Sequence, residues 1–410
     1  MGAGTVIVGT GQAGFQAAAS LRSEGYLDLI TLIGEEPHIP YQRPPLSKGF
    51  ILGTQDAAAI ELRPASFYKN HDINLLCGER VVAVLPSEKQ VEIASGGNLS
   101  YDALVLATGA TNRKLQVPGA ELDGVVYLRS LAESIFIKER LLEVREIVVI
   151  GGGFIGLEFA AVAATFKKKV TVVEALPRLM ARVCAPVISE FFRELHASKG
   201  VRILCDQTVT EIRGKNGIAD TVVLKGGSEL HADLVLVGIG VVPNVELARE
   251  AGLAVANGIC VDEYLRTSDA NIFAIGDCAE YPNRFAEGAR IRLESVQNAA
   301  DQAACVAKTI SGRPTVYSDV PWFWTDQYDI KLQMVGISAG HDRIVTRGSR
   351  EARKLSVFYF KGDRLIAIDS INRPVDHMIG RKVMASGAQL TAEQAADESF
   401  DLKKMAIAGV

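Results

Sequence analysis

The pattern that most constrains this chain is a short run of β-branched residues followed by a glycine turn and a helix of small residues, and it occurs twice. It is found in "TVIVGTGQAGFQAAA" (Thr5–Ala19) and again in "VVIGGGFIGLEFAA" (Val148–Ala161). A buried strand that leads through such a turn into a helix opens a βαβ unit, in which the strands pair in parallel. The sequence therefore predicts an α/β protein that contains two such units.

Both turns have the glycine spacing of a dinucleotide-binding site. In that spacing the first glycine permits a tight turn, the second lets a pyrophosphate approach the backbone, and the third lets the helix pack closely on the strand. The helix N-terminus then offers free N–H groups and positive partial charge to the phosphates. The predicted sites contain Gly9, Gly11 and Gly14 at the first turn and Gly151, Gly153 and Gly156 at the second.

An acidic residue ends the next strand after each turn. Glu35 ends "LITLIGEE" and Glu174 ends "KVTVVEA", and a carboxylate in this place can accept hydrogen bonds from a ribose diol. Because Glu174 would repel a 2′-phosphate, NADH is expected at the second site rather than NADPH. Arg178 and Arg182 lie nearby, and their positive charge is the one feature that would favour a 2′-phosphate. The NAD site is also expected to include Ile155, Arg182 and Gly240.

Two dinucleotide sites in one chain indicate that one dinucleotide stays bound while the other exchanges. FAD accepts a hydride from a nicotinamide when the protein holds the two rings together. We therefore expect tightly bound FAD at the first site and NADH as the cosubstrate at the second.

The chain of 410 residues is too long for a single hydrophobic core. Two later strands end in glycine turns, "ALVLATG" and "DLVLVGIG", and mark the passage into and out of an inserted unit. The last ninety or so residues alternate like antiparallel strands around a Gly-Asp turn. We predict an FAD-binding domain from residues 1–110 and 243–320, an NAD-binding domain at 111–242, and a C-terminal α+β domain at 321–410.

Composition excludes several classes of protein. The formal net charge of -4 argues against general nucleic-acid binding, which requires a basic field. Apolar runs are too short for a membrane helix, and the chain starts without a signal core, so a cytoplasmic protein with no membrane partner is expected. The cysteines show no CxxC, CxxxxC or metal-type spacing, and no metal is expected.

Four motifs in order carry a resemblance to a known family. They are the first glycine turn, "LVLATG", the second glycine turn and "TSDANIFAIGD", and together they resemble the two-dinucleotide flavoprotein reductases of the glutathione-reductase fold. The stretches "PYQRPPLSK", "GGGFIGLE", "RLESVQNA" and "PWFWTDQYDIKLQMVG" are similar to the ferredoxin reductases that serve bacterial cytochrome P450 and ring-hydroxylating systems. This second resemblance covers nearly the whole chain.

The resemblance implies roles for particular residues. Asp277 matches the aspartate that holds the ribityl chain of FAD in the family. Lys48 lies in a loop that covers the flavin, and Glu158 lies on the helix that points at the nicotinamide. We predict an ion pair between Lys48 and Glu158 near flavin N5, in which Lys48 favours the reduced flavin and Glu158 orients the carboxamide. The resemblance also implies FAD contacts by Ala13, Arg43, Lys48, Val81, Arg129 and Val296.

The acceptor of the electrons follows from the cysteines together with the resemblance. Disulfide reductases of this fold need a thiol pair beside the flavin, and this chain lacks one. In the resembling family the acceptor is a [2Fe–2S] ferredoxin, which takes one electron at a time and feeds a cytochrome P450 or a ring-hydroxylating oxygenase. Rubredoxin, a quinone, ascorbyl radical or oxygen remains an alternative acceptor. An NADH-sensing flavoprotein similar to apoptosis-inducing factor is the alternative that is not an enzyme.

A basic stretch, "HDRIVTRGSREARK", offers a hypothesis for docking. It carries Arg343, Arg347, Arg350, Arg353 and Lys354 against two acidic residues. Redoxins of these systems are acidic, and a basic surface would steer them toward the flavin.

Overall fold

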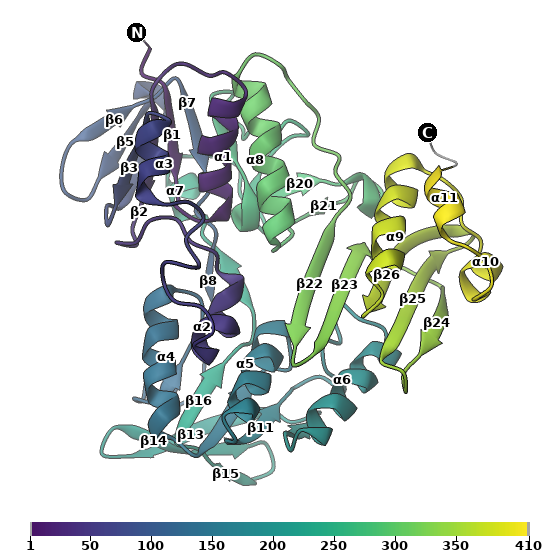
Figure 1. Ribbon diagram of the computed structural model, residues 1–410. Coiled ribbons are helices and arrows are strands. Elements are labelled where there is room, and N and C mark those ends of the chain that lie inside the picture. The colour runs from purple at the N-terminus through teal and green to yellow at the C-terminus, as the bar shows by residue number, and fades with distance from the viewer. Residues whose placement is uncertain (1, 408–410) are drawn as a thin grey trace. The chain divides into compact units, whose positions relative to one another are not determined.

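The computed structural model describes residues 2–407, which form two compact units (Figure 1). The first unit consists of Met1–Gln42, Ala57–Thr111 and Val242–Phe323. The second consists of Arg43–Asp56, Asn112–Val241 and Trp324–Val410. Two short strands, β8 (Ala110–Asn112) and β17 (Val241–Pro243), occur where the chain passes from one unit to the other.

A parallel sheet forms the centre of the first unit. Its order is β19-β7-β1-β2-β3, and Thr5 of β1 pairs with Ile30 on one side and Ala103 on the other. The central strand is buried along its whole length, as expected for a strand covered on both faces. The bounds are β1 (Thr5–Val8), β2 (Ile30–Gly34), β3 (Ile73–Cys77), β7 (Ala103–Leu106) and β19 (Ile272–Ala274).

Two long helices of the first unit pack against each other. They are α1 (Gln12–Ser23) and α8 (Val296–Ile310). Small buried residues such as Ala17 and Ala303 allow the two backbones to approach closely. The smaller elements of this unit are α3 (Ala65–Asn70), α7 (Glu246–Glu250), β4 (Val81–Leu85), β5 (Gln90–Ile93), β6 (Asn98–Ser100), β18 (Ile259–Cys260), β20 (Ala279–Pro282), β21 (Arg290–Ile291) and the 3₁₀ turns η2 (Pro86–Glu88), η3 (Gly276–Cys278) and η4 (Arg284–Ala286).

The second unit contains a second parallel sheet, in the order β12-β11-β10-β16-β9. Helix α5 follows β10 and is buried on almost every side, because its apolar and small residues leave it no polar face. Helix α4 starts with a capping box between Ser130 and Glu133. The bounds are β9 (Val125–Val126), β10 (Glu146–Ile150), β11 (Lys169–Val173), β12 (Arg202–Leu204), β16 (Leu234–Val237), α4 (Leu131–Glu143), α5 (Phe154–Thr165) and α6 (Pro186–Ser198).

Two antiparallel sheets and a short loop segment complete the second unit. The three-stranded sheet has the order β13-β14-β15, and the five-stranded sheet has the order β22-β23-β26-β25-β24. The first two residues of β22 belong to the first unit and the other four to the second. The loop segment after Gln42 contains η1 and α2. The bounds are η1 (Pro44–Ser47), α2 (Gly49–Leu52), β13 (Val209–Lys215), β14 (Ile218–Leu224), β15 (Glu229–His231), β22 (Trp322–Gln327), β23 (Ile330–Gly336), β24 (Arg343–Ser349), β25 (Lys354–Lys361), β26 (Arg364–Ile371), α9 (Pro374–Ser386), α10 (Ala392–Ala396) and α11 (Lys403–Ile407).

The two parallel sheets confirm the predicted α/β class. The prediction of a separate C-terminal domain, and the assignment of one domain to FAD and another to NAD, stay predictions. Within residues 2–407, the helices all lack the length and apolar character needed to cross a bilayer.

A buried acid lies inside the C-terminal sheet. Asp369 on β26 is 1% exposed and accepts a hydrogen bond from the Tyr359 hydroxyl on β25. The Tyr359 hydroxyl in turn accepts one from the Ala185 backbone N–H, 3.0 Å away. Burial raises the pKa of Asp369 from 3.8 to about 7, although the hydrogen bond from Tyr359 acts in the opposite direction.

We expect this acid to make stability depend on pH. A raised pKa means that the folded protein binds a proton that the unfolded chain has already lost, so this contribution is complete below pH ~4 and disappears as the pH rises through about 7. Relative to Asp369→Asn, the wild-type protein should lose up to about 3 kcal/mol of stability between pH 5 and pH 8. Urea unfolding followed by circular dichroism measures the difference.

The control is Asp363→Asn, which removes an exposed carboxylate from the turn between β25 and β26. Its stability should run parallel to that of the wild type at both pH values. A gap between wild type and Asp369→Asn that is the same at pH 5 and pH 8 would contradict the assignment.

Candidate functional site

The first glycine turn leaves the start of α1 open. Gly9 has a φ of 117°, and a Cβ added there would lie 2.1 Å from the Ala107 carbonyl oxygen. A Cβ at Gly14 would lie 1.8 Å from the Gly9 oxygen, so the close packing of helix on strand requires glycine. At Gly11, by contrast, nothing lies within 4 Å, and no side chain caps α1. The helix start is therefore suited to bind a phosphate through its backbone N–H groups.

Asp277 lies beside this turn in the first unit. The preceding residue, Gly276, has a φ of 76°, and a Cβ added there would lie 3.0 Å from Cβ of Ala13 on α1. The Gln302 side chain fixes Gly276 by accepting its N–H at 2.7 Å. Arg292 donates to the Asp277 carbonyl oxygen at 2.9 Å. The structure thus brings Asp277 and Ala13, which both belong to the predicted FAD site, to the same end of α1.

The other predicted FAD residues of the first unit are more scattered. Glu35 follows Gly34, whose added Cβ would meet the Thr10 side chain of the glycine turn at 2.2 Å. The Glu35 carboxylate is exposed, and its Oε1 lies 3.9 Å from Arg80 Nη1. Val81, by contrast, is buried in the hydrophobic core at the start of β4, and Val296 opens α8. A contact of either valine with FAD stays a prediction.

The second glycine turn repeats this arrangement in the second unit. Gly151 has a φ of 108°, and an added Cβ would lie 2.4 Å from the Gly238 oxygen. A Cβ at Gly156 would lie 2.2 Å from the Gly151 oxygen. Gly153 has open space around it, and α5 starts without a side-chain cap. The turn therefore suits a second pyrophosphate.

Glu174 is held against the second turn. Its carboxylate accepts N–H groups from Gly152 at 2.6 Å and from Leu176 at 2.8 Å. Arg178 turns inward and donates to the carbonyl oxygens of Cys184 and Ala181. Arg178 therefore stabilises the loop before α6 by hydrogen bonds to backbone carbonyl oxygens.

The remaining predicted NAD residues are accessible. Arg182 is exposed, and Ile155 on the first turn of α5 has 43% of its surface exposed. Gly240 has a φ of 111° and open space around its α-carbon. Its carbonyl oxygen accepts the Arg113 N–H at 2.9 Å. All three residues are exposed to solvent, and their contact with NADH stays a prediction.

A buried carboxylate joins three segments of the second unit. Glu158 on α5 is 3% exposed, and Lys48 Nζ lies 2.9 Å from its Oε1. Ser47 Oγ donates to its Oε2 at 2.5 Å, and Thr325 Oγ1 on β22 donates to its Oε1 at 2.6 Å. The structure thus brings Lys48 and Glu158 together and adds Ser47 and Thr325, which were not predicted. Both lie in motifs quoted above, but nothing in the sequence shows which residue they face.

Hydrogen bonds to the segment around Ser130 hold the proline-rich segment in place. Pro44 starts η1, as its fixed φ favours. The Ser134 hydroxyl donates to the Leu46 carbonyl oxygen at 2.8 Å, and Arg43 donates to the Arg129 carbonyl oxygen at 2.6 Å. Arg43 and Arg129 are therefore close to each other in the second unit. Their contact with FAD stays a prediction.

One arginine of the basic stretch is buried, and a part of the others in docking stays a prediction. Arg347 is 7% exposed and donates to the carbonyl oxygens of Asp397 and Phe400, so its proposed part in docking is wrong. The side chain instead satisfies carbonyl groups just beyond α10. The other arginines are paired with carboxylates, in the pairs Arg343–Glu393, Arg350–Glu194 and Arg353–Asp329.

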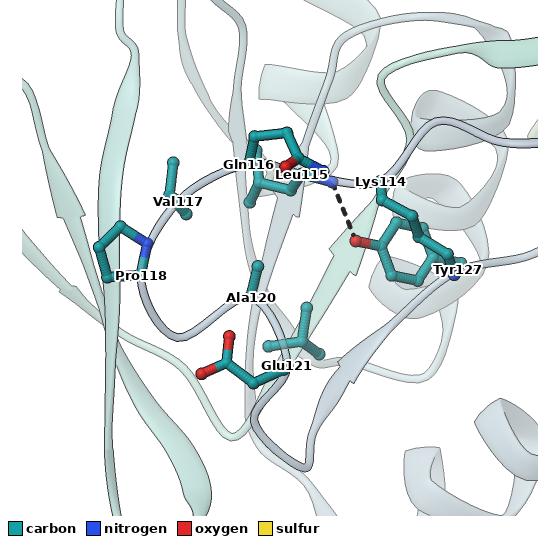
Figure 2. Close-up of a pocket in the computed structure, with 9 residues that line it drawn as sticks. Lys114, Leu115, Gln116, Val117, Pro118, Ala120, Glu121 and Tyr127 are labelled. Atoms are coloured by element: carbon teal, nitrogen blue, oxygen red, sulfur yellow. Dashed lines mark hydrogen bonds between the residues drawn. The ribbon is translucent and has the colours of Figure 1, made fainter.

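Figure 2 shows a pocket of about 740 Å³ in the second unit. Lys114 Nζ lies 3.8 Å from the centre of the Tyr127 ring, and the Tyr127 hydroxyl accepts the Leu115 N–H at 3.1 Å. The lining residues are Lys114, Leu115, Gln116, Val117, Pro118, Ala120, Glu121, Val125 and Tyr127. None of them was predicted to contact a cofactor.

Comparison with known proteins agrees with this geometry. A model of the family described as pyridine nucleotide-disulphide oxidoreductase matches residues 4–303, and one described as reductase C-terminal matches residues 322–406. Rhodocoxin reductase of Rhodococcus erythropolis is 51% identical over 97% of this chain and 93% of its own. A rubredoxin-NAD(+) reductase of Pseudomonas putida is 43% identical over 90% of this chain and 96% of its own.

A solved structure is similar along the whole chain. The ferredoxin reductase for the CYP199A2 system from Rhodopseudomonas palustris has a TM-score of 0.96 and 48% identity. The match covers 98% of this chain and 99% of that one.

The two glycines of the second turn should respond differently to alanine. Gly156→Ala places a methyl group against the Gly151 oxygen and should lower the melting temperature, because the helix must move away from the strand. Gly153→Ala meets no protein atom and keeps an ordinary φ of -83°, so stability should be unchanged. Its methyl group would occupy the approach of the pyrophosphate and should raise KM for NADH about tenfold.

Ferricyanide reduction by NADH measures KM, and thermal unfolding measures stability. Gly11→Ala, the equivalent change at the first turn, should leave KM for NADH unchanged and lower FAD content instead. An unchanged KM in Gly153→Ala would show that NADH does not approach this turn.

Proposed function

The chain belongs to the pyridine nucleotide-disulphide oxidoreductase family, and we propose on this basis that it is an FAD-containing, NADH-dependent ferredoxin reductase. The observation that carries the proposal is the pair of glycine turns, each left open at its second glycine at the start of an uncapped helix. One turn per unit provides for two dinucleotides, as transfer between FAD and NADH requires.

The residues of each turn fit their cofactor. The starts of α1 and α5, which no N-cap side chain covers, suit the pyrophosphates of FAD and NADH. Asp277 beside Ala13 would hold the FAD chain, and Glu174 would accept the ribose diol of NADH. Since Glu174 already fixes the loop through two backbone N–H groups, it would present its charge in a set position. A 2′-phosphate would meet this negative charge, so NADH is preferred to NADPH.

When held at the first glycine turn, FAD would supply the redox chemistry that links a two-electron hydride donor to a one-electron acceptor. Overall, each NADH is oxidised to NAD⁺, one proton is released, and two oxidised ferredoxins each gain one electron. The protein supplies positioning and charge. Lys48 would offer positive charge to the reduced flavin, and Glu158, buried against Lys48, would orient the nicotinamide carboxamide.

The thiols support direct transfer to a separate acceptor. All six cysteines lie within residues 2–407, where none of them forms a disulfide bond, and burial raises the pKa of all six thiols. A thiol that stays protonated is a poor nucleophile and a poor entry to disulfide chemistry. The thiols thus argue against a disulfide acceptor, and the similarity to a solved ferredoxin reductase supports a [2Fe–2S] ferredoxin, which would pass electrons to a cytochrome P450 or a ring-hydroxylating oxygenase. Unpaired cysteines are also typical of the cytoplasm, where we place the protein.

One other acceptor has specific support. The rubredoxin-NAD(+) reductase relative is 43% identical over 90% of this chain, so the same flavin could serve a rubredoxin. The two acceptors differ in shape and in iron site, and neither the glycine turns nor Glu158 distinguishes between them.

Acceptor and cosubstrate can be tested in one assay. We expect NADH-driven reduction of cytochrome c to depend on an added [2Fe–2S] ferredoxin, with a much smaller rate when rubredoxin replaces it. NADPH should give a kcat/KM at least about tenfold lower than NADH, because Glu174 opposes a 2′-phosphate. Turnover with rubredoxin alone would replace the proposed acceptor, and slow turnover with every acceptor would favour an NADH-sensing flavoprotein.

The buried ion pair has its own test. Lys48→Ala and Glu158→Gln should each slow the reduction of bound FAD by NADH at least about tenfold, because a charge that positions or stabilises the reacting rings is lost. Anaerobic stopped-flow absorbance of the purified holoenzyme measures the rate. Lys69→Ala removes an exposed lysine on α3 and serves as the control. Full FAD content with wild-type reduction rates in both variants would contradict the assigned roles.

A further inference from the structure

A row of buried polar side chains leads from α6 to the Glu158 carboxylate within the second unit. It contains His196 in the last turn of α6 and Gln327 and Thr325 on β22, which are 0%, 1% and 0% exposed. Thr325 and Gln327 are two positions apart and therefore face the same side of the strand. Polar groups buried this deeply are costly unless each finds a partner.

Each member of the row contacts the next. The Tyr328 hydroxyl lies 3.3 Å from His196 Nδ1, and His196 Nε2 lies 2.8 Å from Gln327 Oε1. Gln327 Nε2 lies 3.4 Å from Thr325 Oγ1, and Thr325 Oγ1 lies 2.6 Å from Glu158 Oε1. The row is therefore continuous from the loop after β22 to the carboxylate beside Lys48.

The chemistry of the groups gives the row one direction. A carboxylate only accepts hydrogen bonds, so the Thr325 hydroxyl must donate the hydrogen bond to Glu158. Thr325 can then accept from the Gln327 amide, and the Gln327 oxygen must accept from His196 Nε2–H. Burial lowers the pKa of His196, although the hydrogen bond with Gln327 opposes this, so the ring stays neutral and its Nδ1 accepts from Tyr328. Every donor points toward Glu158.

Tyr328 closes the far end of the row in an unusual conformation. Its φ of 55° is uncommon for a residue other than glycine. Its ring lies 5.2 Å from the His196 ring, centre to centre, so it contacts the imidazole by both ring and hydroxyl. Such backbone strain persists where the surroundings fix a residue firmly.

We propose that Thr325, Gln327 and His196 are positioning residues that hold the Glu158 carboxylate in one orientation toward the bound cofactors. The proposal rests on the role assigned above to Glu158. Without Thr325, the Oε1 atom keeps Lys48 alone and the carboxylate is free to turn about its contact with Ser47. With Thr325 present, each carboxylate oxygen has a hydroxyl donor, and hydrogen bonds in a directed row strengthen one another.

The test replaces the last donor of the row. Thr325→Val keeps the side-chain shape and removes the hydroxyl, and should lower the rate of FAD reduction by NADH about tenfold, the effect of losing one hydrogen bond to a charged group. Thr325→Ser restores the donor and should recover most of the rate. The matched control is Thr309→Val, a buried threonine on α8 whose hydroxyl donates to the Cys305 carbonyl oxygen.

Two further readouts do not depend on turnover. Thr325→Val should lower the two-electron midpoint potential of bound FAD by about 30 mV, which corresponds to a tenfold change in the equilibrium constant for its reduction. Without the threonine hydroxyl, the Glu158 carboxylate would neutralise more of the Lys48 charge that favours the reduced flavin. In the wild-type protein, ¹⁵N NMR of labelled histidine should show His196 neutral with its proton on Nε2. A His196→Gln variant assigns the signal, and a proton on Nδ1 would overturn the direction of the row.

The outcomes separate this inference from the proposed function. If Glu158→Gln slows FAD reduction while Thr325→Val leaves both rate and potential unchanged, the row is not a positioning device and the role of Glu158 stands. If Glu158→Gln also has no effect, both fail. Neither result depends on which acceptor the enzyme serves, because only the reaction with NADH is followed.

Discussion

The second unit depends on how one buried carboxylate is satisfied. A carboxylate removed from water is costly by several kcal/mol unless charge and hydrogen bonds replace the lost solvent. Glu158 meets this demand with donors from two other segments, Ser47 and Lys48 beside η1 and Thr325 on β22. Because removing any donor leaves charge unsatisfied, the proline-rich segment, α5 and the C-terminal sheet are bound to one point.

The glycine turns solve the opposite problem, since they work by leaving space. Side chains at Gly9, Gly14, Gly151 or Gly156 would collide with backbone carbonyl oxygens. Each turn can therefore pass the neighbouring segment, and each helix can approach its turn, only where Cβ is missing. The second glycine of each turn lies in open space, and there the constraint comes from the ligand. A reductase that works by positioning a flavin ring and a nicotinamide ring needs such open helix starts and a buried ion pair.

The α/β class and both glycine turns could be predicted from sequence, because they depend on local spacing and on the conformations that only glycine adopts. The partners of Glu158 beyond Lys48 could not. Thr325 reaches the carboxylate, and Gln327 reaches His196, only because β22 presents one face to α5 and α6. A short sequence motif does not show which helices a strand face will contact. The same limit explains Arg347, whose place in a basic stretch suggested a surface but which caps backbone carbonyls instead.

The most direct test of the central claim is an anaerobic double-mixing experiment. The holoenzyme is first reduced with one equivalent of NADH and then mixed with an oxidised [2Fe–2S] ferredoxin, while flavin and iron–sulfur absorbance are followed together. We expect the flavin to be reoxidised rapidly as two equivalents of ferredoxin become reduced. A flavin that is reduced by NADH but stays reduced in the presence of several ferredoxins would contradict the assignment as a ferredoxin reductase.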